Sequence, residues 1–126
     1  AAKVVELLQN HRNVARVEYA GLADSKYHAL AEKYMPNGTC GVLCFGPKGG
    51  RDGAMRFTNG LKRVAIVTHV ADARSCVLHP PSHTHRQLND QQLIEAGVLP
   101  DLIRLSVGIE DVNDIIADLD QALANV

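Results

Sequence analysis

The segment Leu102–Asp111 constrains the fold more than any other part of this chain. Its apolar, branched residues predict a β-strand, which ends at a glycine and is followed by the acidic residues typical of a helix start. Arg104 stands inside this strand. A buried cation is costly unless an anion meets it, and a guanidinium fits a carboxylate with two parallel N–H donors. Spacing alone favours an internal salt bridge with one of the acidic residues; the alternative is a receptor for the carboxylate of a ligand.

Helical and strand-like patterns alternate along the chain with short connections. Apolar spacing, caps and breakers predict helices over residues 2–10, 25–34, 51–60, 89–96 and 111–124. Strands are predicted over residues 14–19, 41–46, 64–70, 75–79 and 102–109. Within these elements, Ser25 and Asp111 are expected to cap helices, and Met55 to face inward. The alternation predicts one α/β domain over residues 1–126, a two-layer sandwich with helices on one face of a mixed or antiparallel sheet.

Composition and charge restrict the class of partner. The chain has 126 residues, 46% of them hydrophobic, and a formal net charge of −1. This balance favours neither a nucleic acid nor an anionic membrane as partner. No apolar run approaches the roughly 18 residues of a membrane span, and no signal-peptide pattern is present, so we expect a cytoplasmic protein. Cys40, Cys44 and Cys76 are accordingly expected to be reduced core residues.

Two kinds of reactive site can be considered from the histidines. His79, His83 and His85 lie close together with Cys76 nearby, but their spacing fits no familiar zinc pattern. A polar loop that fixes the local backbone or lines a substrate cleft is favoured over a metal site. His69 and Cys76 could form a nucleophilic pair, but a thiol in an apolar strand is usually inert.

Several blocks of the chain resemble a known family. Asp72–Pro80, His79–Leu88 and Leu102–Asp111 resemble the C-terminal part of the cysteine/methionine-metabolism family of pyridoxal-phosphate enzymes, and Asn13–Val17 and Gly41–Gly50 extend the resemblance over nearly the whole chain. The resemblance implies a small C-terminal domain of a fold-type I enzyme.

Two shorter blocks point to one branch of this family. Asp72–Ser75 and Thr84–Leu88 favour the O-acetylhomoserine sulfhydrylases, also called homocysteine synthases. That branch makes homocysteine or methionine from O-acetylhomoserine and sulfide or a thiol by γ-replacement. Cystathionine γ-synthases, cystathionine γ-lyases and methionine γ-lyases share the same blocks and remain alternatives. So does a non-catalytic α/β binding or oligomerisation module.

The resemblance also implies what this chain does not carry. In the family, the Schiff-base lysine and the groups that hold pyridoxal phosphate lie in a larger N-terminal domain, and none of the chain's lysines has that context. The chain also opens directly into a helix, as if cut from something longer. We therefore expect a C-terminal substrate-carboxylate-binding fragment that is inactive alone and binds no cofactor or metal. Its expected partners are its own N-terminal cofactor domain, other copies in a homotetramer and a small amino-acid substrate.

The resemblance implies the following substrate-binding residues. Arg104 corresponds to the arginine that grips the substrate α-carboxylate, and Thr84 to a threonine near the same group. His69 stands where the family has a serine or an asparagine that touches the carboxylate. Ser75 follows in the same segment and is also expected to bind substrate. His69 departs from the expected pattern, and Ala71 replaces an expected glycine.

Overall fold

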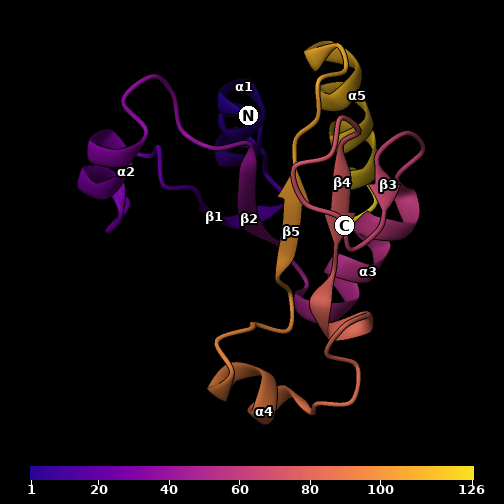
Figure 1. Ribbon diagram of the computed structural model, residues 1–126. Coiled ribbons are helices and arrows are strands. Elements are labelled where there is room, and N and C mark those ends of the chain that lie inside the picture. The colour runs from indigo at the N-terminus through magenta and orange to yellow at the C-terminus, as the bar shows by residue number, and fades with distance from the viewer.

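Five strands form a single mixed sheet in the order β1-β2-β5-β4-β3 in the computed structural model, which describes residues 1–126 (Figure 1). β5, the last strand in sequence, lies between β2 and β4 and is antiparallel to both, and β1 is antiparallel to β2. β3 and β4 are parallel. The strands are β1 (Val14–Glu18), β2 (Val42–Pro47), β3 (Ala65–Ile66), β4 (Cys76–Leu78) and β5 (Ile103–Ser106).

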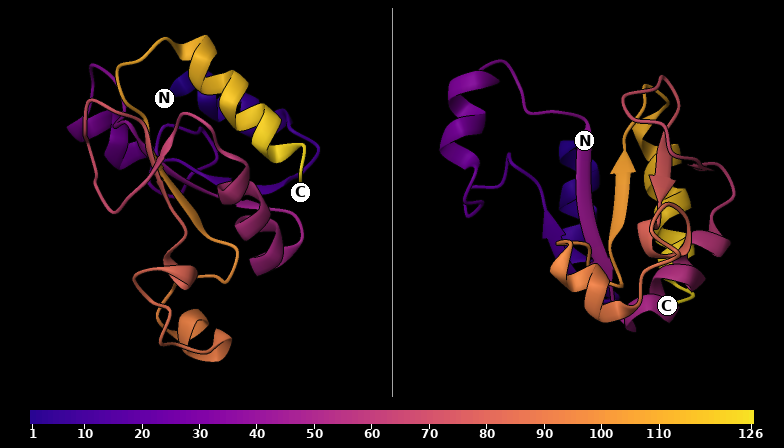
Figure 2. Two further views of the ribbon diagram at one scale, coloured as in Figure 1. Left: turned by 90° about the vertical axis from the view of Figure 1, so that its right-hand side faces the viewer. Right: turned by 60° about the horizontal axis from the view of Figure 1, so that its bottom comes forward.

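Helices α1, α3 and α5 cover one face of this sheet (Figure 2), which confirms the predicted two-layer sandwich. Helices α2 and α4 stand away from the sandwich, α2 at the left and α4 at the bottom of Figure 1. No helix has both the length and the apolar character needed to cross a bilayer. The helices are α1 (Ala2–Asn10), α2 (His28–Tyr34), α3 (Gly50–Gly60), α4 (Asp90–Glu95) and α5 (Val112–Leu123), with a 3₁₀ turn at Pro80–Ser82.

The core fills the space between the sheet and these three helices. Phe45 of β2 meets Phe57 of α3 edge-to-face, with ring centroids 5.3 Å apart. Burial of each large apolar side chain contributes about 1.5–3 kcal/mol to the free energy of unfolding. Asp111 caps α5 as predicted, because its side chain accepts a hydrogen bond from the backbone N–H of Asn113 at 2.8 Å.

Met55 does not face inward as predicted, because its side chain is 41% exposed. The buried face of α3 instead contains Gly53, Ala54 and Phe57. A Cβ at Gly53 would lie 1.8 Å from the carbonyl oxygen of Lys48, so the helix approaches the preceding turn at this position. That approach directs Gly53 inward and turns Met55 toward the surface.

Two other local predictions were also wrong. The strand predicted over 64–70 is limited to Ala65–Ile66, because the chain leaves β4 after Val67 and is held by β5 instead. Ser25 does not cap α2; its Oγ accepts from the N–H of Tyr27 in a turn, and the helix begins at His28.

All three cysteines are free, but only one is a core residue. Cys76 is buried, whereas Cys44 is half-buried and Cys40 is exposed. Cys44 lies on the face of β2 opposite to the core residues Leu43 and Phe45, and Cys40 precedes that strand. The prediction that Cys40 and Cys44 belong to the core was therefore wrong.

A buried carboxylate joins α5 to the segment between α3 and β3. Asp118, only 4% exposed, accepts hydrogen bonds from the backbone N–H groups of Lys62, Arg63 and Val64 at 2.8–2.9 Å. Burial raises the pKa of Asp118, but these three donors outweigh it and hold the pKa below its ordinary value. The ionised form of Asp118 therefore stabilises the fold.

We predict that Asp118→Asn lowers the free energy of unfolding at pH 7 by about 2–4 kcal/mol, since a charged acceptor is lost and a buried N–H is left unpaired. Because the folded pKa lies below the unfolded one, this stabilisation is present above about pH 4 and is lost as the pH falls further. Urea denaturation at several pH values measures it. Asp120→Asn, at an exposed position of the same helix, is the control and should change little. Equal losses in the two variants would contradict the role of Asp118.

Candidate carboxylate-binding site

Arg104 lies on the side of β5 that faces away from the core helices. Strand alternation places its neighbours Ile103 and Leu105 in the core, where both are fully buried. The Arg104 side chain is only half-buried, so the deeply buried cation expected from the sequence is not found. In the register of the sheet, Arg104 lies between Cys44 of β2 and Leu78 of β4.

The guanidinium of Arg104 contacts main-chain carbonyls rather than an acid. Nη2 donates to the carbonyl oxygen of Thr68 at 2.8 Å and to that of His69 at 3.2 Å. None of the ion pairs in the structure includes Arg104, so the internal salt bridge that spacing alone favoured is absent. The two carbonyls orient the side chain while its charge stays uncompensated. Nε and Nη1 have no protein partner and are the donors that an anion would meet.

The other predicted site residues are only partly brought to Arg104. His69 contributes its carbonyl oxygen, while its exposed imidazole lies 3.3 Å from Asp72. The hydroxyl of Thr84 is exposed and is hydrogen-bonded to His85 at 2.8 Å, and no hydrogen bond joins it to Arg104. Their roles toward a substrate therefore remain predictions.

Ser75 is fully engaged within the protein. It is 1% exposed, and its N–H and hydroxyl donate to the two carboxylate oxygens of Glu110 at 2.6 and 2.9 Å. Its Oγ also accepts from the N–H of Gly108 at 2.9 Å. A direct contact of the Ser75 hydroxyl with substrate would require these bonds to break, and its substrate role stays a prediction.

Two residues that matter for this site were missed by the sequence analysis. Ser106 and Glu110 both bind the loop at residues 68–75, Ser106 by accepting from the N–H of Ala71 and Glu110 by accepting from Ser75. Ser106 could have been found because it lies two residues after Arg104 and so on the same face of a strand. Glu110 carried no comparable signal, since an acid near a helix start is expected for the helix dipole alone.

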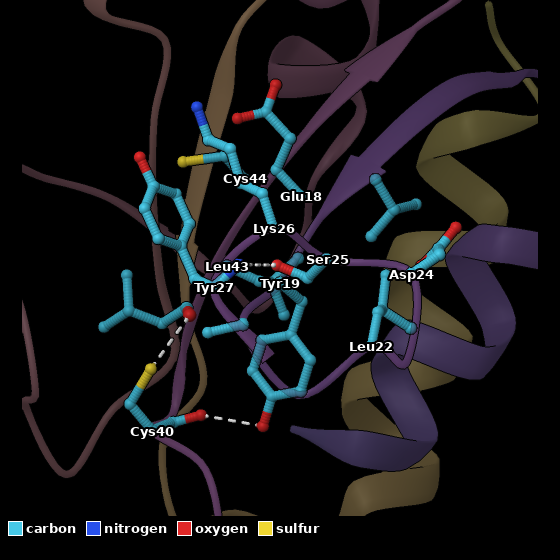
Figure 3. Close-up of a pocket in the computed structure, with 13 residues that line it drawn as sticks. Glu18, Tyr19, Leu22, Asp24, Ser25, Lys26, Tyr27, Cys40, Leu43 and Cys44 are labelled. Atoms are coloured by element: carbon cyan, nitrogen blue, oxygen red, sulfur yellow. Dashed lines mark hydrogen bonds between the residues drawn. The ribbon is translucent and has the colours of Figure 1, made fainter. Parts of the chain in front are cut away.

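A cavity of about 540 Å³ opens on the neighbouring part of the sheet (Figure 3). It lies between β1, β2 and the loop that leads to α2, and its lining includes Glu18, Tyr19, Cys40 and Cys44. The hydroxyl of Tyr19 donates to the carbonyl oxygen of Cys40 at 3.0 Å. Burial, followed by the charge of Glu18, raises the pKa of the Cys44 thiol, which favours its protonated form.

Over its whole length the chain is similar to members of one known protein family. The family model described as Cys/Met metabolism PLP-dependent enzyme matches residues 1–124. The O-acetyl-L-homoserine sulfhydrylase of Leptospira meyeri is 42% identical over 127 residues, covering 100% of this chain and 29% of that protein. The homocysteine synthase of Schizosaccharomyces pombe is 46% identical over 123 residues, covering 98% of this chain and 29% of that protein.

A solved structure shares the fold. It is described as an O-acetylhomoserine (thiol)-lyase of Campylobacter jejuni, is 37% identical and superposes with a TM-score of 0.88, covering 98% of this chain and 30% of that chain. The chain belongs to the Cys/Met metabolism PLP-dependent enzyme family. The resemblance inferred from the sequence is thereby confirmed, and the chain spans about 29% of the length of the curated relatives it matches.

The cofactor of this family does not fit the residues of this chain. The Campylobacter structure carries a pyridoxyl-lysine phosphate, which lies outside the part that this chain matches. All five lysines here are exposed, and none hydrogen-bonds to Arg104 or to the loop at residues 68–75. Residues 1–126 therefore hold no lysine at this site that could anchor pyridoxal phosphate. The lysines are Lys3, Lys26, Lys33, Lys48 and Lys62.

His79 and His83 fix the local backbone, one of the two roles predicted for the histidines of this segment. His79 is fully buried; its Nε2 lies 2.8 Å from the carbonyl oxygen of Pro100 and its Nδ1 2.7 Å from the hydroxyl of Ser82. Because a carbonyl can only accept, Nε2 carries the proton and Nδ1 accepts from Ser82. His83 contacts the carbonyl oxygen of His79 at 3.0 Å. The structure gathers no group of three or more metal-binding side chains.

The alternative nucleophilic pair is not formed either. The Cys76 thiol donates to the carbonyl oxygen of Arg74 at 3.1 Å, while the imidazole of His69 contacts Asp72. Burial, followed by the charge of Asp72, raises the pKa of Cys76, so its inert thiol form is favoured.

We predict that His79 makes the stability of the protein depend on pH. Burial lowers the pKa of His79 below its ordinary value of 6.5, so the unfolded chain takes up a proton that the folded chain resists. The free energy of unfolding should therefore fall as the pH drops below about 6.5. His79→Gln should cost stability at pH 8 and flatten this dependence between about pH 7 and 5, measured by urea denaturation. An unchanged slope in the variant would contradict the prediction.

Proposed function

We propose that this chain is the substrate-carboxylate-binding part of an O-acetylhomoserine sulfhydrylase. In this proposal the whole enzyme uses pyridoxal phosphate to replace the acetate of O-acetylhomoserine by sulfide or a thiol. Residues 1–126 supply the group that holds the α-carboxylate of the amino-acid substrate. The relatives named as sulfhydrylases and homocysteine synthases support this branch of the family.

One observation carries the proposal, the uncompensated guanidinium of Arg104. Two carbonyl dipoles hold its Nη2, no carboxylate neutralises it, and its remaining donors are free. An arginine held in this way is suited to bind a planar anion. Gripping the α-carboxylate restricts rotation of the substrate and so fixes which bond at Cα is presented for reaction. The contribution of Arg104 is therefore binding and orientation.

The surface of the chain supports a partner that completes the site. Tyr27, Leu30 and Tyr34 are 53%, 51% and 69% exposed, and their spacing places them on one side of α2. Apolar side chains grouped in this way are typical of an interface. We assign this contact to the N-terminal domain. Because that domain holds the cofactor in this proposal, residues 1–126 are inactive alone. A homotetramer in the cytoplasm is the expected form of the whole enzyme.

We predict that Arg104→Ala in the full-length enzyme raises KM for O-acetyl-L-homoserine strongly, with a smaller loss in kcat. Losing a charged contact of about 2–5 kcal/mol corresponds to a fall in kcat/KM of roughly 30-fold to several thousand-fold. Arg104→Lys should lie between wild type and Arg104→Ala, since it keeps the charge but loses the planar fork. Steady-state kinetics with sulfide as co-substrate measure the effect.

The controls separate carboxylate binding from general damage. Arg63→Ala removes an exposed arginine that pairs with Asp114 and should leave KM unchanged. An analogue of O-acetylhomoserine that lacks the carboxylate should react equally slowly with wild type and Arg104→Ala. A wild-type KM in Arg104→Ala would overturn the proposal. So would a fall in kcat/KM for the analogue as large as the fall for O-acetylhomoserine.

A further inference from the structure

The loop at residues 68–75, whose carbonyls orient Arg104, is itself held by β5. Residues 68–75 leave the sheet after β3 and return at β4, and their carbonyls at Thr68 and His69 are the contacts of the guanidinium. An arginine side chain has many rotamers, so its orientation depends on how well these carbonyls are fixed. Loop geometry therefore controls the geometry of the site.

Ser106 holds this loop at its most strained point. Its Oγ accepts from the N–H of Ala71 at 2.9 Å, and Ser106 is 1% exposed. Ala71 has φ +57°, the only positive φ outside glycine in the chain. Such a conformation is unfavourable for an L-residue with a side chain and persists only where the surroundings impose it. The hydroxyl of Ser106 is the acceptor for the N–H of this strained residue, Ala71.

A second set of contacts fixes the far end of the loop. The N–H of Ile109 donates to the carbonyl oxygen of Ala73 at 2.9 Å, and Glu110 accepts two hydrogen bonds from Ser75. A Cβ at Gly108 would lie 2.4 Å from that same carbonyl oxygen of Ala73, so only glycine permits this approach. With this end secured, Ser106 is the tie, other than Arg104 itself, between β5 and the part of the loop next to His69.

We propose that Ser106 is a positioning residue for Arg104: by holding Ala71, it keeps the carbonyls of Thr68 and His69 where they orient the guanidinium toward the substrate carboxylate. This inference rests on the proposed function. Ser106 itself does not touch substrate; it acts through the loop. Its place two residues after Arg104 on one strand couples the two side chains in a fixed geometry.

A double-mutant cycle in the full-length enzyme tests this coupling. Ser106→Ala should lower kcat/KM for O-acetyl-L-homoserine about 3- to 10-fold, the effect of one lost hydrogen bond, mainly through KM. In the Arg104→Ala background the same substitution should have no further effect, because there is no guanidinium left to orient. A fall of the same size in both backgrounds, or none in either, would overturn the inference.

Two further variants distinguish the positioning role of Ser106 from a general loss of structure. Thr58→Ala removes another buried hydroxyl, bonded within α3 on the opposite face of the sheet, and should leave KM unchanged. If Ser106→Ala does not fold, Ser106→Cys enters the same cycle, because a thiol of similar size accepts hydrogen bonds only weakly. Should Arg104→Ala itself leave KM unchanged, the proposed function fails; should Arg104→Ala raise KM while the Ser106 variants do not, only the positioning role fails.

Discussion

The two-residue alternation of one central strand determines both the stability and the chemistry of this chain. β5 lies between β2 and β4, so its side chains must satisfy two opposite environments at once. Ile103 and Leu105 are fully buried beneath the helices, while Arg104 and Ser106 lie on the other face. A shift of one residue in register would bury the cation and expose the core, which makes the position of Arg104 inseparable from the packing of the fold.

The way Arg104 is held explains how a cation can be ordered without being neutralised. Carbonyl oxygens orient the guanidinium through directional hydrogen bonds but carry no net charge, so the attraction for an incoming anion is retained. A carboxylate in the same place would have lowered the gain from binding a substrate. The arrangement is not a structural ion pair, and its fixed geometry supports the proposed role as a preorganised receptor.

The fold was predictable where a pattern is set locally, and less so where distant residues decide. The alternation of elements, the cap at Asp111 and the strand within residues 102–109 followed from spacing. The role proposed for Arg104 came from the family resemblance, since spacing and the cost of burying charge favoured an internal salt bridge that is not formed. The outward turn of Met55 could not be predicted, since it depends on how closely Gly53 approaches Lys48. The early end of the strand at Ile66 depends on hydrogen bonds from β5, which lies far along the chain. Arg104 was found from the sequence, whereas its carbonyl partners were not, because any residue type can supply a backbone carbonyl.

The acidic residues around the site remain bound elsewhere, and this leaves Arg104 available. The pKa of Asp72 is lowered by the N–H of Arg74 and then by His69, so its carboxylate is committed to its own loop. Burial raises the pKa of Glu110, but hydrogen bonds from Ser75 outweigh it and hold the ionised form in place. Each carboxylate is thus ionised at neutral pH and directed at donors other than the guanidinium. The same hydrogen bonds that close the loop therefore also prevent the nearby acids from occupying the position proposed for the substrate.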